Sequence, residues 1–239
     1  MERRSGVALW RQIADEIRRN IGTGALAADG RLPPETALAE RFGVNRHTVR
    51  GAIASLVQEG VLRAEQGRGT FVETRRRLSY PIAARTRFST GFEGQVRERR
   101  ARLLDHATEP ADARVADALE LAEDTPVVRM ESLAEADGRA ISRATSWFEA
   151  GRFAGVPRAF ELSGSITAAL AQSGVADYLR KSTLVSARHA DASDLSDLNL
   201  SPGAIVLVTL ALNVDPEGRP VQFAETRFAA DRVELSVQS

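Results

Sequence analysis

Apolar residues in the first quarter of the chain recur with the period of an α-helix. One stripe, spaced four residues apart, consists of Leu9, Ile13, Ile17 and Ile21. This spacing predicts an amphipathic helix with one buried face. The same periodicity predicts a second helix over residues 35–42 and a third from Asn45, a favourable N-cap, to about residue 59. Gly43 and Val44 make the short turn between these two helices.

A glycine-rich hairpin follows the third helix, with short strands predicted on either side of residues 66–69. Two helices joined by a short turn that contains glycine form a helix-turn-helix, whose second helix enters the major groove of DNA with its first residues. The candidates for base contact are therefore Arg46, His47, Thr48 and Arg50. Gly67 and Gly69 let the hairpin backbone approach DNA, and Arg68 is available for phosphate or the minor groove.

The remaining two thirds of the chain mix strand-like and helix-like patterns, which indicates an α+β domain. Asp137 and Gly138 lie between two strand-like segments and are a hairpin signal. We expect strands over residues 127–136, 140–148, 184–192, 205–214 and 221–229. We expect helices over residues 89–102, 111–121, 165–173 and 194–200. This pattern predicts an antiparallel sheet with helices on one side. The expected domains are 1–74 and 85–239, with a linker over 75–84.

Charge is balanced over the whole chain but not along it. The chain has 32 basic and 32 acidic residues, whereas residues 1–78 carry 14 arginines against 9 acidic residues, a net charge of +5. A basic N-terminal third beside a mildly acidic remainder suits a nucleic-acid-binding module joined to a domain with a different partner. Arginines 75–77 form a basic run in the linker, which is either a solvated tether or a further phosphate contact.

Composition excludes several classes of protein. The chain of 239 residues contains no cysteine, which excludes disulfides, thiolate catalysis and cysteine-based zinc sites. It has no apolar run of about 18 residues and no signal-peptide core at its start, so we expect a cytoplasmic protein with no membrane partner. His47, His106 and His189 are scattered, and no catalytic or phosphate-loop motif is present. We therefore expect no catalytic residues, no metal site and no cofactor.

The ordered set of N-terminal motifs resembles a known family. The segment LPPETALAERFGVNRHTVRGAIASLVQEGVLRAEQGRGTFV is similar to the winged helix-turn-helix domain of GntR-type bacterial transcription regulators, and the similarity covers about residues 8–73. The residues that this resemblance assigns to DNA contact are Thr36, Arg46, Thr48, Arg50, Gly67 and Arg68. Asn45 stands where serine is common and His47 is at a variable position, so the operator sequence is not implied. Arg46 and Arg50 alone would also suit a solvated helix face.

The second half resembles the effector-binding (UTRA) domain of the HutC-like branch of this family, which has a chorismate-lyase-like fold. RTRFSTGFEGQ and the long segment from DYLRKSTLVSARHADASDLSDLNL to VQFAETRFAADRVEL are especially similar to regulators of phosphonate-uptake and carbon–phosphorus-lyase operons. We expect a homodimer, because a two-fold dimer presents equal surfaces to the half-sites of a palindromic DNA operator. We expect a repressor that a phosphonate or related phosphorylated molecule releases from DNA.

Several residues of this half suit an anionic effector. Ser89 and Thr90 at a predicted helix start offer hydroxyls and backbone N–H groups, and Ser165 offers a second site of the same kind. Arg129 on a strand can bind a phosphate or phosphonate with two hydrogen bonds. By resemblance to sugar-phosphate-binding members, these four residues form an anion clamp and Glu225 faces the other end of the ligand. Weaker candidates are Arg143, Arg188 and Arg227.

Each of these residues also has a purely structural interpretation. Ser89 and Ser165 can be helix N-caps, and Glu225 with Arg227 can be an ion pair on the sheet surface. Glu131 stands where this branch often has a second arginine, which favours an anion other than a sugar phosphate. The alternative functions are a regulator that senses a different anionic metabolite and a DNA-binding dimer with no effector. An enzyme is a third class, suggested by the fold alone.

Overall fold

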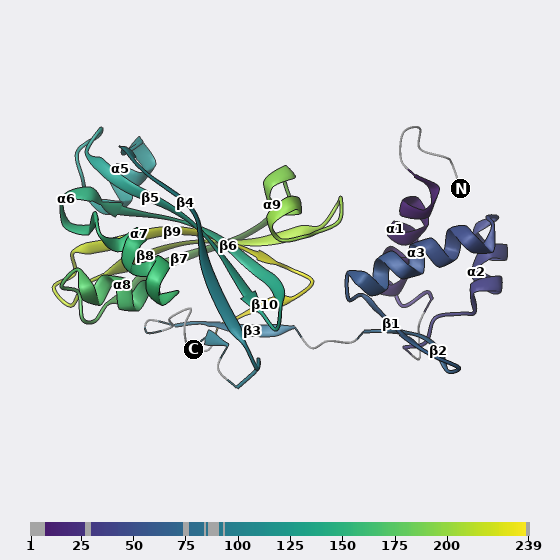
Figure 1. The fold of residues 1–239 in the computed structure, drawn as a ribbon. Helices are drawn as coiled ribbons and strands as arrows, with labels where there is room; N and C mark the ends of the chain where they lie inside the picture. Colours follow the sequence, from purple (N-terminus) through teal and green to yellow (C-terminus); the bar gives the residue numbers. More distant parts are fainter. Residues whose placement is uncertain are drawn as a thin grey trace. The chain divides into compact units, whose positions relative to one another are not determined.

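Two compact units, Met1–Arg76 and Arg77–Ser239, make up the chain (Figure 1). The structure is a computed structural model that describes residues 8–26, 30–73, 77–83, 85, 91–92 and 94–237. The elements of the N-terminal unit are α1 (Leu9–Gly22), α2 (Glu35–Phe42), α3 (Arg46–Gln58), β1 (Leu62–Glu65) and β2 (Gly69–Val72). None of the helices in the described parts of the chain is long and apolar enough to span a membrane.

The N-terminal unit has its own apolar core beneath the three helices. Ile13 and Ile17 of α1 are fully buried against Leu38 of α2 and Leu56 of α3, as the helical stripe predicts. The turn between α2 and α3 is fixed by Gly43, whose φ of 63° is left-handed and favours glycine. The three predicted helices and the hairpin are all confirmed within a few residues.

The C-terminal unit contains a six-stranded antiparallel sheet in the order β4-β5-β6-β9-β8-β7 and a small parallel pair of β3 and β10. The strands are β3 (Leu78–Ile82), β4 (Arg99–Pro110), β5 (Pro126–Ala136), β6 (Arg139–Glu149), β7 (Leu179–His189), β8 (Ile205–Val214), β9 (Pro220–Ala229) and β10 (Val233–Val237). The helices are α5 (Ala113–Leu119), α6 (Ala150–Phe153), α7 (Val156–Ser163), α8 (Ile166–Gln172) and α9 (Ala192–Asp197).

Helices cover both faces of the large sheet, which corrects the expectation that they lie on one side. On the first face α5 packs on Trp147 and Phe223. On the second face α7 and α8 pack on Phe148, the neighbour of Trp147 in β6, and Figure 1 shows them on the other side of the sheet from α5. Successive residues of a strand point to opposite faces, so adjacent apolar residues require a cover on each.

The second face carries a further cover at its other end. Here β3 and β10 bring Tyr80 and Val233 against Phe228 of β9. Tyr80 and Phe228 have ring centroids 5.2 Å apart. The second face therefore has one apolar cluster under α7 and α8 and another under the β3–β10 pair, with the middle of the sheet between them.

Two sequence predictions in this unit are wrong. The expected helix over 89–102 is wrong at its C-terminal end, because residues 99–102 begin β4, which pairs with β5 along its length. Arginines with good helix propensity fill this segment, and pairing with β5 overrides that propensity. The expected linker over 75–84 includes β3, whose Tyr80 is paired with Leu235 of β10. Residues 74–76 lie outside the described residues.

Candidate DNA-binding surface and effector cavity

The first turns of α3 present a basic, solvent-facing surface. Val49 is fully buried, whereas the side chains of Arg46 and Arg50 are 57% and 55% exposed and His47 is also exposed. Asn45 caps the helix by accepting a hydrogen bond from the backbone N–H of His47 at 2.9 Å. The structure thus places the predicted base-contacting side chains at the accessible N-terminal end of a well-capped helix.

The carboxylate of Glu35, at the start of α2, accepts hydrogen bonds from both arginines. Glu35 accepts a hydrogen bond from Nε of Arg46 at 2.8 Å, and two from Nε and Nη2 of Arg50 at 3.2 and 3.0 Å. The hydrogen bonds from Arg50 and then Arg46 lower the pKa of Glu35 below its usual value. The two guanidinium groups are therefore held side by side before any ligand arrives.

Sequence reasoning missed this role of Glu35. The residue lies 11 and 15 positions before its two partners, and no helical spacing links them. Only the helix-turn-helix geometry brings the first turn of α2 to the first turns of α3. Thr36, the next residue, is exposed on α2, and Thr48 is half-buried on α3.

The β1–β2 hairpin, which we call the wing, supplies the other predicted DNA contacts. Gly67 and Gly69 have φ values of 76° and 114°, and Arg68 between them has a side chain that is 75% exposed. A Cβ at position 69 would lie 3.1 Å from Nε of Arg31. A larger residue would therefore displace Arg31 as well as strain the backbone.

The predicted effector residues on the large sheet form an ion network instead of a clamp. Glu131 accepts a hydrogen bond from Nε of Arg143 at 3.2 Å and is 3.5 Å from Nη1 of Arg129 and from Nη2 of Arg227. Arg129 also donates to Asp105 at 2.9 Å, and this hydrogen bond lowers the pKa of Asp105. All of these side chains lie on the first face of the sheet with Leu133.

The remaining candidates are divided between several places. Glu225 accepts a hydrogen bond from Arg114 at 3.1 Å, so the ion pair that we considered for Glu225 with Arg227 is not formed. Arg188 donates to the buried Asp194 at 2.5 Å. Ser165 caps α8 through the backbone N–H of Ala168 at 3.3 Å. The interpretation of Ser165 as an N-cap is confirmed. The same residue also lines the cavity described below.

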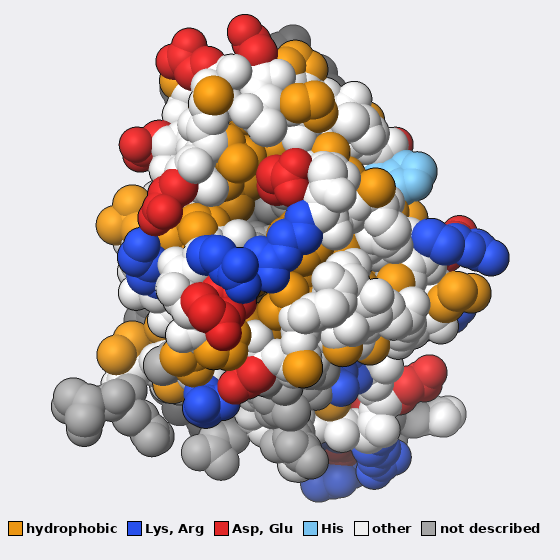
Figure 2. All heavy atoms as spheres, turned by 90° about the vertical axis from the view of Figure 1, so that its left-hand side faces the viewer, with side chains coloured by type: hydrophobic (Ala, Val, Ile, Leu, Met, Phe, Trp, Pro, Cys, Tyr) orange, Lys and Arg blue, Asp and Glu red, His pale blue; other side chains and the backbone are white. Residues whose placement is uncertain are grey.

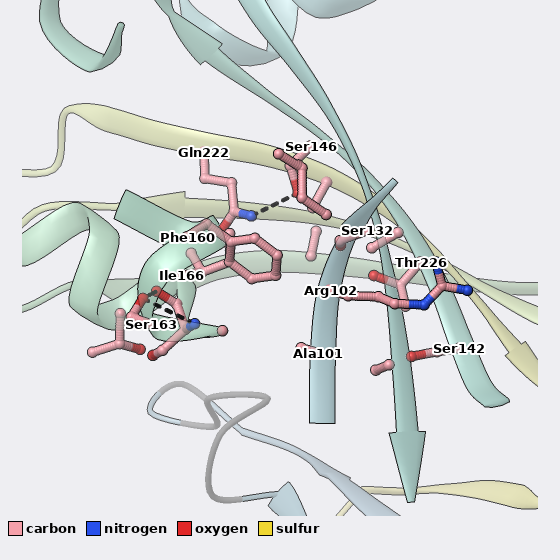
Figure 3. Close-up of a pocket in the computed structure, with 18 of the residues that line it drawn as sticks. Ala101, Arg102, Ser132, Ser142, Ser146, Phe160, Ser163, Ile166, Gln222 and Thr226 are labelled. Carbon is pink, nitrogen blue, oxygen red and sulfur yellow. Dashed lines mark hydrogen bonds between the residues drawn. The ribbon is translucent and has the colours of Figure 1, made fainter. Parts of the chain in front are cut away.

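A cavity of about 560 Å³ occupies the middle of the second face, between the two apolar clusters. Figure 3 shows Phe160, Ser163 and Ile166 on the helical side, with the residues of the sheet opposite them. Ser165 lines this cavity, whereas Arg129 lies on the opposite face of the sheet. The predicted clamp of Ser89, Thr90, Arg129 and Ser165 is therefore not assembled. Ser89 and Thr90 lie outside the described residues.

Small and neutral residues hollow out the sheet beneath this cavity. We call the inward positions of β5, β6, β8 and β9 the cavity floor. They are Ser132, Ala134, Ser142, Ala144, Ser146, Thr209, Ala211, Asn213, Gln222, Ala224 and Thr226. Each strand thus alternates hydroxyl- or amide-bearing residues with alanine on its inward face. The low volume of these side chains explains why a cavity forms where a sheet face is usually filled.

Arginines border the cavity on the two edge strands of the sheet. Arg99, Arg100 and Arg102 of β4 and Arg180 of β7 line it. Arg180 donates from Nη2 to the hydroxyl of Tyr80 at 3.5 Å, while its buried Nε has no acceptor among the described residues. On the outer face of the molecule that Figure 2 shows, basic side chains lie beside acidic ones.

Comparison with known proteins identifies both units. Residues 9–72 match the bacterial regulatory proteins of the gntR family, and residues 94–234 match the UTRA domain. The chain belongs to the GntR family. The resemblance found in the motifs is confirmed, and so is the α+β fold of a DNA-binding helix-turn-helix unit joined to a UTRA sheet domain.

This GntR regulator has similar proteins in several bacteria. It is 53% identical over 239 residues to an uncharacterized HTH-type transcriptional regulator of Rhizobium meliloti, which covers 100% of this chain and 98% of that protein. It is 34% identical over 232 residues to the probable transcriptional regulator PhnF of Escherichia coli, covering 96% of this chain and 94% of that protein. Because the family and these relatives are transcriptional regulators, the protein is not an enzyme.

A solved structure shares the fold. The crystal structure of PhnF from Mycobacterium smegmatis matches with a TM-score of 0.65 at 21% identity, over 95% of this chain and 98% of that chain. The crystal structure of a PhnF C-terminal domain covers 70% of this chain and 98% of that chain at 25% identity, with a TM-score of 0.56. Both helix-turn-helix and UTRA units of this GntR regulator thus have the arrangement of secondary structure found in PhnF.

The cluster around Glu35 predicts a pH-dependent stability. Because the pKa of Glu35 is lowered in the folded state, its stabilisation is present above the ordinary value of 4.5 and is lost as the pH falls through the lowered pKa. Glu35→Gln should therefore lower the free energy of unfolding by about 0.5–1 kcal/mol at pH 7 and by less at pH 3. Chemical denaturation of both proteins at each pH measures the difference.

The control for this measurement is Glu40→Gln on the same helix. Glu40 is exposed and makes no ion pair within the described residues. Its substitution should leave the free energy of unfolding within about 0.5 kcal/mol of the wild type at every pH. A Glu35→Gln effect that stays constant from pH 7 to pH 3 would rule out ionised Glu35 as its source.

Proposed function

We propose that this GntR regulator is a homodimeric, cytoplasmic repressor that binds a palindromic operator and is released by a phosphonate or related phosphorylated small molecule. The observation that carries the DNA-binding part is the exposed pair of Arg46 and Arg50, held by Glu35 at the start of α3. A pair of guanidinium groups in this position suits the acceptor atoms of guanine in the major groove, which arginine binds with two hydrogen bonds.

The other contacts follow from the same placement. We assign Thr36 and Thr48 to phosphate oxygens beside α3, and the exposed His47 to a base edge. The exposed tip of the wing, formed by Gly67, Arg68 and Gly69, suits the minor groove. Glu35 neutralises part of the positive charge of Arg46 and Arg50 in the free protein, so DNA competes with Glu35 for the same donors.

The cavity of the UTRA domain supports the effector part of the proposal. Arg180 has an N–H group with no protein acceptor, and the arginines of β4 that line the cavity have no ion-pair partner among the described residues. An anionic group can accept hydrogen bonds from these side chains and from Ser165. We therefore assign the anion to the cavity arginines and Ser165, in place of the predicted clamp on Arg129.

Release from DNA requires only a modest coupling between the two sites. An effector that binds the DNA-free geometry of the dimer better by about 1–3 kcal/mol would weaken operator binding 5- to 150-fold. The alternative is a DNA-binding dimer with no effector. A cavity of about 560 Å³, lined by arginines that have no ion-pair partner among the described residues, would have no role in that protein.

An exposed strand edge supports the homodimer. β7 is at one edge of the six-stranded sheet, and residues 182–187 carry no charge. Leu184 and Val185, which point to opposite faces of this strand, are 65% and 46% exposed. Natural sheet edges are usually protected by charges or proline, and an unprotected edge readily pairs with another strand. We propose that β7 of a second copy pairs here in the antiparallel direction, which gives the two-fold symmetry that a palindrome needs.

DNA binding is tested by footprinting DNA upstream of the neighbouring genes. We expect a symmetric footprint with wild-type protein, and we expect Arg50→Ala to weaken binding to that DNA by roughly 10- to 150-fold, the effect of losing one base contact. Arg19→Ala removes the same charge from α1, where Arg19 pairs with Glu16. This control should bind nearly as well as the wild type. Unchanged affinity of Arg50→Ala would remove Arg50 from the reading surface.

Dimerisation is tested at β7. Val185→Lys should shift the protein from dimer to monomer in sedimentation analysis, because two lysines would then approach each other across the proposed strand pair. Leu162→Lys, at a residue of α7 that is 69% exposed, places the same charge away from that edge and should leave the dimer intact. A dimer that survives Val185→Lys at micromolar concentration contradicts pairing through β7.

The effector site is tested with methylphosphonate and inorganic phosphate as probes. At millimolar concentration either one should reduce operator binding by wild-type protein, and Arg180→Ala should abolish this response while the affinity for DNA without probe stays unchanged. Arg129→Ala, on the opposite face of the sheet, is the matched control and should keep the response. If Arg129 is required for the response and Arg180 is not, the anion-binding site is on the first face of the sheet.

A further inference from the structure

We propose that Arg31, which precedes α2 and lies beside the wing, binds a phosphate of the DNA strand that runs between the two grooves contacted by the protein. This inference rests on the DNA-binding part of the proposed function, in which α3 enters the major groove and the wing enters the minor groove. It adds a DNA contact that belongs to neither the reading helix nor the wing hairpin. A phosphate contact of this kind sets the affinity for any duplex and does not select bases.

The first argument is the place of Arg31 in the fold. Arg31 forms an antiparallel β-bridge with Phe71 of β2. Backbone hydrogen bonds of 2.8 Å on either side of this bridge join residues 30–32 to β2. These residues therefore lie along the wing as a short third strand. Only three residues then separate Arg31 from Glu35, the first residue of α2.

This position matters because the two DNA-contacting parts of the unit lie on either side of one strand of a duplex. With α3 in the major groove and the wing in an adjacent minor groove, the sugar–phosphate backbone between these grooves passes between them. Arg31 lies at the junction of the two parts, bridged to the wing and followed closely by the α2–α3 pair. Because many hydrogen bonds between proteins and DNA go to phosphate oxygens, a cation at this junction is well placed to bind one.

The second argument is the way in which the guanidinium group is held. Its Cζ lies 5.9 Å from the ring centroid of Phe71, in a cation–π contact. Gly69 leaves room for it, because a Cβ at that position would lie 3.1 Å from Nε and 3.2 Å from Nη2 of Arg31. Arg31 nevertheless remains exposed to solvent. A guanidinium that is already held against the wing loses less conformational freedom when it binds a phosphate.

The third argument is the small net charge of the folded reading unit. Residues 9–73 contain 9 arginines against 8 acidic residues, so most of the basic excess counted over residues 1–78 lies outside them in the sequence. A unit with so little excess charge attracts DNA only weakly through its overall field. Its affinity for the phosphate backbone therefore depends on where single arginines such as Arg31 are placed.

Arg63 offers a matched control for Arg31. Its Cζ lies 5.6 Å from the centroid of the same aromatic ring, and its side chain is also exposed. However, Arg63 belongs to β1, which lies on the other side of β2 from residues 30–32 and follows the last turn of α3. It also forms ion pairs with Glu65 and Glu73. Its removal takes away one arginine and one cation–π contact but leaves the junction unchanged.

The test measures binding of the full-length protein to two duplexes of equal length, the footprinted DNA and a shuffled sequence, at salt concentrations from about 50 to 200 mM. Arg31→Ala should weaken binding to both duplexes about 3- to 10-fold, the effect of one hydrogen-bonded contact. The logarithm of the binding constant should also fall less steeply with the logarithm of the salt concentration, by about 0.9 for each copy of the protein bound. Arg63→Ala should stay close to the wild type in both measurements.

Two further variants separate the charge of Arg31 from its packing. Arg31→Gln keeps a polar side chain and removes the charge, so its salt dependence should match that of Arg31→Ala. Arg31→Lys should keep the wild-type salt dependence, because lysine also binds phosphate through its charge. Thermal melting followed by circular dichroism checks that each variant is folded at the temperature of the binding measurement.

The outcomes separate this inference from the proposed function. If Arg31→Ala and Arg31→Gln leave the salt dependence unchanged, or if Arg63→Ala has the same effect as Arg31→Ala, the phosphate contact is wrong. The proposed reading of an operator still stands in that case, provided that the wild type prefers the footprinted DNA to the shuffled duplex. If the wild type binds both duplexes equally while Arg31→Ala weakens both, operator reading is overturned and the phosphate contact is supported.

Discussion

The alternation of side chains along the strands of one sheet determines where the UTRA domain has a cavity. The central strands β5, β6 and β9 are largely buried on both faces, so successive residues of each strand pack beneath opposite covers. Bulky pairs such as Trp147 and Phe148 pack in this way at the end of β6 near α5 and α7. In the middle of the same strand the inward residues are serine and alanine, and the space that they leave is the cavity. The cavity forms because these side chains are small, and no additional structural element is needed to form it.

The same alternation separates two sets of charges that look equivalent in the sequence. Arg129, Arg143 and Arg227 have carboxylate partners on the first face, where Glu131 is within 3.5 Å of all three. The charged groups of such a network already have ionic partners, and they leave few donors for a ligand. Arg180 lines the cavity, and its Nε has no acceptor in the part of the chain that the structure describes. Whether an arginine stabilises the fold or is available to an anion is decided here by which face it occupies.

The extent to which the sequence predicts this structure differs between the two units. The N-terminal helices and the wing follow from local signals, the four-residue stripe, Gly43 and Asn45, each of which acts through near neighbours. The C-terminal errors all involve distant partners. β4 exists because β5 pairs with it, and β3 because β10 does. The sequence predicts Arg129 as a ligand contact because the pattern of a strand does not show which of its two faces borders a cavity. The floor residues have a signal, serine or threonine alternating with alanine, but alanine and serine are also common in ordinary cores.

The strand β3 is part of the cavity wall and is also the strand nearest in sequence to the wing. It is the first described strand after the wing, and residues 73–77 are all that separate it from the end of β2. Its Tyr80 lines the cavity and accepts a hydrogen bond from Arg180, while its backbone is joined to β10, the last strand of the chain. A ligand that contacts Arg180 would therefore act next to a strand that five residues of the chain separate from the wing.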